Sequence, residues 1–268
     1  MPTITPSVML WTLTGTFEEK LSLAAGAGIR SVGLVTEPRA WAGSDIDKYM
    51  KLAQSHGIAF DTIVGNYDWL NRPVTMLNPA HRDAFLNDIE EAIVWAKKLN
   101  VPQIIVLAGN VQPGLPHETQ HASMVESGKR AADLAGAADV TLILEPLNPK
   151  IDHQGYFLPD CKEGLAVVKA VDSPHFCLLF DIYHEYVQAG NVIPTIKDCV
   201  AHTTMFHVAD APGRHGPGTG EMPWDEIYRT IAETGYSGYV ALEYLPVGDQ
   251  LKSLTKATAE MVEACGRE

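Results

Sequence analysis

The sequence predicts an α/β fold, a (β/α)8 TIM barrel that spans residues 1–268 as a single domain. Short apolar runs alternate with helix-like segments about eight times, which is typical of a parallel sheet. Several helix-like segments stop at a small or turn-forming residue just before the next run, and 268 residues is a normal length for one closed barrel. An open doubly wound sheet is the alternative, but no GxGxxG motif follows the first run, so closure is favoured.

Each predicted strand is a short apolar run of the kind found in strands buried on both faces of a parallel sheet. In chain order the predicted strands are 7–12, 31–35, 59–64, 103–109, 141–146, 176–181, 203–208 and 239–244. Their number and even spacing favour a barrel over a smaller sheet.

The predicted helices lie between these strands, with the clearest patterns at 17–28 and 79–100. In the second, Asp83 stands in the first turn, where the helix dipole favours an acid. Apolar residues recur there at three-and-four spacing and predict a buried stripe: Phe85, Ile89, Ala92, Ile93 and Ala96. Residues suited to the left-handed conformation that ends a helix precede four strands: Gly28, Gly57, Asn100 and Gly235.

Composition excludes several classes of function. Apolar residues make up 46% of the chain and charged residues 20%, an ordinary globular balance. The net charge of −13 repels phosphates, so neither nucleic acid nor an anionic membrane is an expected partner. The four cysteines show no metal-like spacing and are expected to be reduced. With no signal-peptide pattern and no apolar run long enough to span a membrane, a cytoplasmic location is expected.

Four acidic or imidazole side chains stand at the ends of successive predicted strands, where a buried charge needs a partner or a metal. The ends of parallel barrel strands meet at one face, so these side chains are expected to converge. Their oxygen donors and one imidazole suit Mn²⁺, Mg²⁺ or Co²⁺ better than a structural zinc. The predicted ligands of this divalent cation are Glu145, Asp181, His207 and Glu243.

Further candidate site residues lie in the loops after these strands. His184 follows Asp181 by three residues and is expected to face the same pocket, and His153, after the fifth predicted strand, is a further candidate. The loop at 209–221 is rich in Gly and Pro, and its Arg214 suits a substrate oxygen or carboxylate. Aromatic and amide side chains at the barrel mouth either contact a substrate or fill the mouth: Trp11, Tyr67, Trp69 and Asn110.

At these residues the chain resembles a known family. The segments EPLN, DHQGYFL, FDIYHEYVQAGN, ADAPGRHGPGTGE and LEY are similar to the hydroxypyruvate isomerase branch of the xylose isomerase-like TIM barrels. The likeness is dense over 141–246 and mainly architectural over 1–110. It implies the metal ligands named above, substrate contacts at His184 and Arg214, and a homodimer or homotetramer.

The resemblance also implies an activity, proton transfer next to a carbonyl through an enediolate. Glu145 and Glu243 are the expected proton carriers, as in the related ketose 3-epimerases. Isomerisation of hydroxypyruvate to tartronate semialdehyde is the first hypothesis. Three positions depart from the hydroxypyruvate isomerase pattern: His207 stands where Gln is usual, Gly33 where an acid is usual, and Asn110 ends the fourth strand where His is usual.

These departures leave other functions open. Within the family the alternatives are a ketose 3-epimerase, an inosose dehydratase and a lyase acting on keto-sugars or 3-keto-glycosides. A non-catalytic sugar-binding partner subunit is the alternative from another class, which the presence of both glutamates disfavours. An apurinic endonuclease shares the barrel, but it must attract DNA, and the charge of −13 argues against it.

Overall fold

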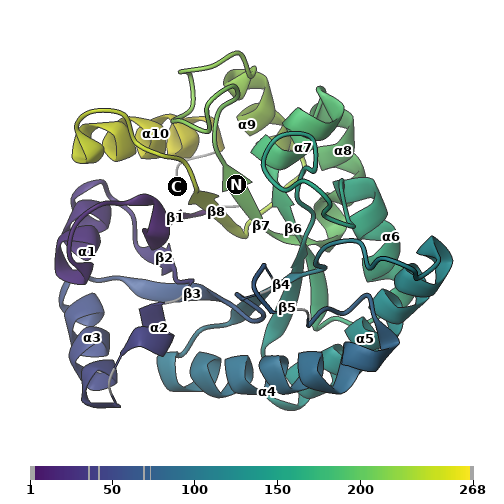
Figure 1. Ribbon diagram of the computed structural model, residues 1–268. Coiled ribbons are helices and arrows are strands. Elements are labelled where there is room, and N and C mark those ends of the chain that lie inside the picture. The colour runs from purple at the N-terminus through teal and green to yellow at the C-terminus, as the bar shows by residue number, and fades with distance from the viewer. Residues whose placement is uncertain (1–3, 36, 42, 69, 73, 266–268) are drawn as a thin grey trace.

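A closed barrel of parallel strands forms the centre of the protein, seen in the computed structural model that describes residues 4–35, 37–41, 43–68, 70–72 and 74–265 (Figure 1). The strands follow one another in chain order, and β8 pairs with β1 to close the sheet. They are β1 (Thr5–Met9), β2 (Ser31–Gly33), β3 (Ala59–Val64), β4 (Gln103–Leu107), β5 (Thr141–Glu145), β6 (Phe176–Asp181), β7 (Thr203–Val208) and β8 (Tyr239–Leu242). The predicted (β/α)8 fold is therefore confirmed.

Helices surround the strands as an outer ring (Figure 1). The α-helices are α1 (Phe17–Gly26), α2 (Glu37–Ala40), α3 (Gly43–Ser55), α4 (Arg82–Leu99), α5 (His117–Ala137), α6 (Cys161–Val171), α7 (Ile182–Ala189), α8 (Ile193–Cys199), α9 (Trp224–Glu233) and α10 (Gln250–Cys265). Short 3-10 turns are η1 (Leu10–Thr12), η2 (Pro79–His81) and η3 (Val200–His202). No described helix combines the length and apolar character needed to cross a membrane.

Helix ends follow local chemistry that the sequence already contains. Thr16 and Glu19 form a reciprocal capping box at the start of α1. Asn100 ends α4 in the left-handed conformation with φ 54°, and Gly235 adopts φ 78° before β8. The buried stripe of α4 includes Phe85, Ile89, Ala92 and Ala96, as its spacing predicted, whereas Ile93 is half-buried. These signals set where each helix stops and the next strand begins.

Five predicted strands were too long at their carboxyl ends. Pairing between β1 and β2 stops at Met9 and Gly33, so Leu10–Thr12 turn into η1. Likewise β4 ends at Leu107, β5 at Glu145 and β8 at Leu242. A parallel strand ends where its neighbour no longer supplies hydrogen bonds, which apolar character alone does not reveal. As a result, Trp11 lies in η1 and Glu243 directly follows β8, each just past its strand.

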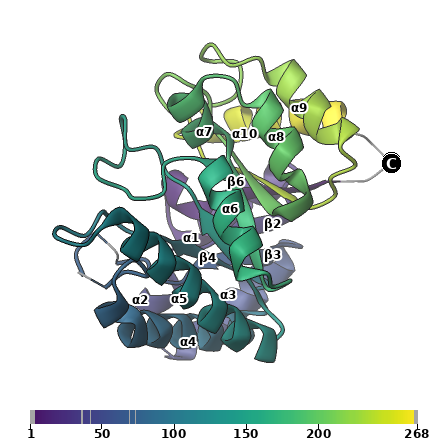
Figure 2. The same cartoon turned by 90° about the vertical axis from the view of Figure 1, so that its right-hand side faces the viewer.

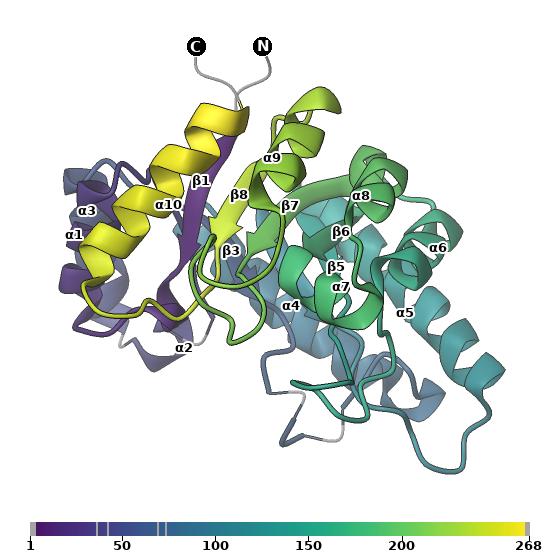
Figure 3. The same ribbon diagram turned by 90° about the horizontal axis from the view of Figure 1, so that it is seen from above.

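The loops after the strands gather at one end of the barrel. In Figure 2 the long loops before α5 and α6 project to the same side. Figure 3 shows the start of β1 and the end of α10 beside each other at the opposite end. We call the loop-bearing end, where the strands finish, the barrel mouth.

A buried acid also lies lower in the barrel. Asp61, in the middle of β3, is fully buried. Its carboxylate accepts hydrogen bonds from the hydroxyls of Ser7 in β1 and of Thr62, the latter at 3.0 Å. Because β2 separates β1 from β3, the contact between Ser7 and Asp61 crosses the barrel interior.

Candidate metal centre at the barrel mouth

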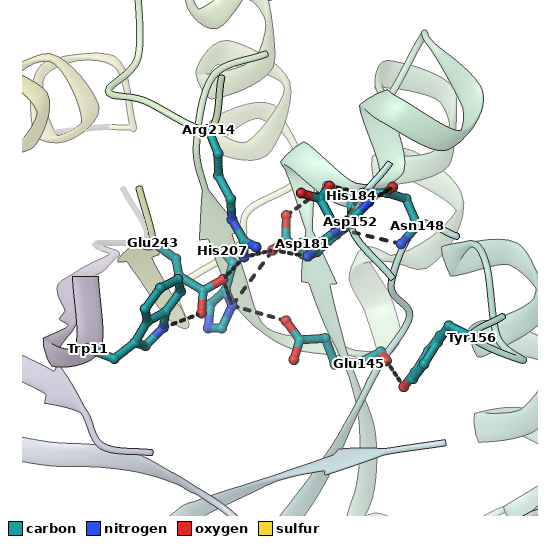
Figure 4. A network of polar contacts seen from close by, with 10 residues as sticks. All are labelled: Trp11, Glu145, Asn148, Asp152, Tyr156, Asp181, His184, His207, Arg214 and Glu243. Atoms are coloured by element: carbon teal, nitrogen blue, oxygen red, sulfur yellow. Dashed lines mark hydrogen bonds and ion pairs between the residues drawn. The ribbon is translucent and has the colours of Figure 1, made fainter. Parts of the chain in front are cut away.

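Four side chains from consecutive strands converge at the mouth (Figure 4). Each offers one ligand atom, and these atoms all lie within 4.8 Å of one another. All are buried at 7% exposure or less: Glu145 and Asp181 as the last residues of β5 and β6, His207 near the end of β7, and Glu243 directly after β8. The predicted convergence is confirmed. We call this set the carboxylate–histidine cluster.

The spacing within the cluster fits a divalent cation. The Nδ1 atom of His207 lies 3.3 Å from Glu145 Oε1, 3.2 Å from Glu243 Oε2 and 4.0 Å from Asp181 Oδ2. Ligands held at about 2.0–2.3 Å from one ion would lie roughly 3–4.6 Å apart. Both ring nitrogens of His207 are buried without a hydrogen-bond partner among the described residues. Buried polar atoms normally find a partner, so this group of residues could hold a metal.

Asp181 both caps α7 and faces the cluster, because β6 ends and α7 begins at this residue. Its Oδ1 atom accepts the backbone N–H of His184 at 2.9 Å and caps α7. Its Oδ2 atom stays 4.0 Å from His207 Nδ1 and faces the cluster. The cap fixes the carboxylate and also brings His184 to the mouth.

Glu243 is held by two donors from distant loops. The indole Nε1 of Trp11, in η1, donates to Oε1 at 2.9 Å, and Arg214 Nη2 donates to Oε2 at 2.7 Å. Arg214 Nη2 also lies 3.7 Å from Asp181 Oδ2. The guanidinium stands 5.6 Å from the ring centre of Trp11 and 5.3 Å from that of Tyr183, within cation–π range.

The loop at 209–221 presents Arg214 in a fixed conformation. Arg214 has a positive φ of 55°, which costs a non-glycine residue energy unless its surroundings impose it. The Asp210 carboxylate accepts the backbone N–H groups of Gly220 at 2.9 Å and Met222 at 3.2 Å, which closes the loop. Leu245 donates its N–H to the Arg214 carbonyl at 2.9 Å. The Nε atom of Arg214 is buried and has no hydrogen-bond partner within the described part of the chain.

The acids of the cluster differ in pKa because their surroundings differ. Burial raises the pKa of Glu145, and burial raises that of Asp181 to about 7 although Arg214 opposes the shift. Burial also acts on Glu243, but the charges of His207 and Arg214 outweigh it and hold its pKa well below the usual range. For His207, the carboxylates of Glu243 and Glu145 outweigh burial and raise its pKa. A cluster of acids held together in this way attracts a cation.

The two predicted histidines lie beside the cluster. His184 is 1% exposed, and its Nε2 atom lies 3.7 Å from Asp181 Oδ2. Burial, followed by the charge of Arg214, keeps its pKa well below the ordinary value, so the ring is neutral. His153 is half-buried, and its ring centre lies 5.2 Å from that of His184. Their contact with a substrate stays a prediction.

The other predicted mouth residues differ in placement. Trp11 is 40% exposed and contributes to a cavity of about 960 Å³ that is also lined by Tyr183, Tyr186 and Arg214. Tyr67 stacks on the guanidinium of Arg39 at 4.1 Å, in the loop after β3. Asn110 follows β4 and forms an isolated bridge with Tyr156. Trp69 lies outside the described residues.

Sequence reasoning missed three residues that support the cluster. The Tyr156 hydroxyl donates to the Glu145 carbonyl at 2.9 Å and accepts the N–H of Ala108 at 2.8 Å. Asn148 contacts His184, and Tyr183 packs against Arg214. Asn148 stands only three residues after Glu145, a proximity that could have found it. Tyr156 is a loop tyrosine whose partners no spacing rule specifies.

Comparison with known proteins places the chain in a family. Residues 21–265 match the model of a family described as xylose isomerase-like TIM barrel. A putative hydroxypyruvate isomerase of Mus musculus is 31% identical over 182 residues, which cover 66% of each protein. A 2-oxo-tetronate isomerase of Pectobacterium atrosepticum is 25% identical over 232 residues, which cover 87% of each.

Solved structures share the fold across nearly the whole chain. A structure described as AP endonuclease, family 2, from Brucella melitensis has a TM-score of 0.85 at 23% identity, covering 97% of this chain and 99% of that one. A D-psicose 3-epimerase from Clostridium cellulolyticum H10 has a TM-score of 0.77 at 19% identity, covering 98% of this chain and 96% of that one. At these identities the likeness shows a common barrel.

Proposed function

The chain belongs to the xylose isomerase-like TIM barrel family, and we propose that it is a divalent-metal-dependent isomerase of short 3-hydroxy-2-oxo acids, of which hydroxypyruvate is the simplest. The relatives' names support this substrate class, because hydroxypyruvate and 2-oxo-tetronate share a carboxylate, an adjacent carbonyl and a hydroxyl on the next carbon. The reaction would move the carbonyl from C2 to C3.

The observation that carries the proposal is the carboxylate–histidine cluster beside a clamped arginine. The cluster supplies three carboxylates and an imidazole within 4.8 Å of one another. Arg214 offers a buried Nε–H that lacks a partner among the described residues, a donor suited to a substrate carboxylate or hydroxyl oxygen. A small hydroxy-carbonyl acid presents oxygens to both.

The chemistry divides between the ion and the side chains. Glu145, Asp181, His207 and Glu243 would hold a Mn²⁺, Mg²⁺ or Co²⁺ ion, which when bound polarises the substrate carbonyl as a Lewis acid. One of Glu145 and Glu243 would remove the proton from C3, and one of them would deliver a proton to C2, while the C3 hydroxyl proton passes to the C2 oxygen. Such proton transfers by a positioned carboxylate typically contribute about 10²–10⁴-fold each.

Other side chains would orient the substrate and exclude water. Trp11 and Arg214 hold the Glu243 carboxylate from two sides, at 2.9 and 2.7 Å, so its oxygens keep a fixed direction. His184 faces the cluster from α7. We assign His184 and Arg214 to substrate oxygens, and His153 and Asn110 to the wider mouth.

A ketose 3-epimerase is the second candidate, and the cavity favours it. The space of about 960 Å³ beside the cluster far exceeds a three-carbon acid, and Trp11, Tyr183 and Tyr186 would suit a sugar ring or chain. Two glutamates acting on opposite faces of an enediolate would epimerise a ketose, whereas return to the neighbouring carbon would isomerise it. The same enediolate could expel a β-substituent, which describes the dehydratase and lyase alternatives.

A substrate panel tests the proposal. Purified protein supplied with Mn²⁺ is incubated in D₂O with hydroxypyruvate, 2-oxo-tetronate and several ketohexoses, and deuterium in substrate and product is measured by NMR. Product formation with deuterium on the oxo acids is the expected result. Turnover of ketohexoses alone would replace the proposal with the epimerase, and no exchange into any compound would favour a non-catalytic binding subunit.

A further inference from the structure

A buried amide beside the cluster holds the ring of His184 (Figure 4). Asn148 is fully buried in the loop after β5. Its Oδ1 atom accepts the backbone N–H groups of Ile151 at 3.0 Å and Asp152 at 3.2 Å. Backbone N–H groups only donate, so the atom that they meet is an oxygen and the other terminal atom is the amide nitrogen.

The amide nitrogen of Asn148 has two hydrogens and two partners. It lies 2.7 Å from Asp152 Oδ2, a carboxylate oxygen, and 2.6 Å from His184 Nδ1. The backbone N–H of Asn148 also points to His184 Nδ1, at 3.4 Å. Two N–H donors at one ring nitrogen require a lone pair there, because a donor cannot face a donor.

The proton of the neutral His184 ring therefore belongs on Nε2. That atom is buried, has no hydrogen-bond partner among the described residues and lies 3.7 Å from Asp181 Oδ2. The ring is further confined by Tyr183 and His153, whose ring centres lie 5.3 and 5.2 Å away. An N–H with no partner in a buried site awaits an acceptor from a ligand.

We infer that Asn148 is a positioning residue that fixes His184 in the Nε2–H tautomer, so that His184 presents a hydrogen-bond donor to a substrate oxygen. The fixed tautomer follows from contacts within the chain, whereas the bond to substrate rests on the proposed function. Imidazole tautomers are commonly set in this way, by the hydrogen bond that the other ring nitrogen makes.

Asn148 shapes the loop at 148–152 and sets the His184 tautomer through different atoms, so the two effects can be separated. The loop conformation needs only the Oδ1 acceptor, which aspartate keeps. The tautomer depends on the Nδ2 donor at 2.6 Å, which aspartate lacks, because the backbone N–H that remains lies farther from Nδ1, at 3.4 Å. Asn148→Asp alone would place a carboxylate against Asp152, so we choose the exchange Asn148→Asp with Asp152→Asn, which conserves the charge of the pair. Asp152→Asn alone keeps the Asn148 donor and is the reference variant.

The first measurement needs no substrate. In protein with ¹⁵N-labelled histidine and excess Mg²⁺, long-range ¹H–¹⁵N correlations report which nitrogen of each ring carries the proton. His184→Gln assigns the signals of His184 among the ten histidines. We expect an unprotonated Nδ1 in the wild type and in Asp152→Asn, and a protonated Nδ1 in the exchanged pair. A protonated Nδ1 in the wild type would overturn the inference, even if the exchanged pair failed to fold.

The second measurement is kinetic. We expect kcat/KM of the exchanged pair to fall about 10- to 100-fold below that of Asp152→Asn, because a lone pair would then face the substrate oxygen. Unchanged kcat/KM with an inverted tautomer would refute the role toward substrate. If no tested oxo acid or ketose is turned over by the wild type, the proposed function fails while the tautomer result still stands.

Asn66 provides a matched control. It is 4% exposed, and its amide bridges the N–H and carbonyl of Leu107 at 2.9 and 2.7 Å, so it ties a loop to β4. Asn66→Asp removes a buried amide donor of similar kind away from His184. It should lower the melting temperature and leave the His184 signals unchanged. A shift in His184 protonation in this variant would mean that general loosening, rather than the Asn148 donor, sets the tautomer.

Discussion

Asp61 and the acids of the carboxylate–histidine cluster are all buried, but their surroundings differ. Asp61 lies mid-strand in β3, where hydroxyls of Ser7 and Thr62 donate to its carboxylate. The acids of the carboxylate–histidine cluster lie at strand ends, where His207 has no hydrogen-bond partner among the described residues. Burial raises the pKa of Asp61 as it does those of Glu145 and Asp181.

The difference shows that burial alone does not mark a functional acid. Asp61 is satisfied by neighbours that its own fold supplies, so its carboxylate completes a polar layer inside the barrel. The cluster brings three carboxylates together, and without a metal their mutual repulsion is offset by Arg214 and by a protonated His207. Three carboxylates gathered in this way are suited to bind an added cation.

The sharpest test of the contrast replaces the proton carriers. Glu145→Gln and Glu243→Gln should each lower kcat about 10²–10⁴-fold, because an amide cannot transfer the proton. Circular dichroism should show an intact fold. A variant that keeps most of the wild-type turnover would remove that glutamate from the mechanism.

The second largest effect should come from metal addition, which distinguishes the carboxylate–histidine cluster from Asp61. Stripped protein should be inactive, and adding Mn²⁺ at about 100 times its Kd should stabilise the wild type by about 2.7 kcal/mol. Differential scanning calorimetry should show that rise in melting temperature for Asp61→Asn but a much smaller one for Asp181→Asn. Equal rises in the two variants would place the ion elsewhere. Full activity after exhaustive chelation would be equally damaging.

Removing the mid-strand acid should affect stability more than turnover. Asp61→Ala leaves the Ser7 and Thr62 hydroxyls without their acceptor inside the barrel, which should cost about 1–3 kcal/mol. Urea titration measures this loss, and kcat should stay within a few-fold of the wild type. A drop in kcat as large as that of the glutamate variants would make Asp61 part of the reaction.

The smallest expected effect is on the pH dependence of stability without metal. Asp181 has a folded pKa of about 7 because of burial, so the folded protein keeps a proton that the unfolded chain releases near pH 4. His207 has a raised pKa, so its stabilisation is complete below about pH 6.5 and declines above it. Both shifts make the metal-free protein less stable as pH rises from 5 to 8.

Glu243 does not reverse that trend in this window. Its pKa is depressed, so its stabilisation is present above the unfolded value and is lost only in acid. Bound metal should invert the slope, because ligation favours deprotonated side chains. Melting temperatures at several pH values, with chelator and with Mg²⁺, check both slopes. A metal-free protein that gains stability toward pH 8 would contradict the assignment.

The sequence predicted the barrel and the convergence of the cluster because both follow from strand order. Parallel strands place their carboxyl ends at one face, so Asp181 and His207 had to approach each other once closure was inferred. Strand ends were less predictable, because pairing at Met9 stops where Gly33 ends β2. Asn148 and Tyr156 escaped prediction because their contacts depend on loop conformations.

Asp61 is a buried acid that the sequence analysis did not single out. It stands in an apolar run, as the cluster acids do, but in the middle of that run rather than at its end. Its position, together with the inward-facing hydroxyl of Ser7, could have identified it as a structural acid. The property that distinguished the two kinds was position along the apolar run, mid-run for Asp61 and at the end for the cluster acids.

The indole of Trp11 bonds Glu243 across 232 positions of the chain. During synthesis on the ribosome, this bond therefore cannot form until the eighth strand has been made. A nascent chain arrested before β8 would leave β1 without its neighbour β8 and would lack one of the acids of the cluster. The cluster would therefore be completed only in a late step, together with closure of the barrel.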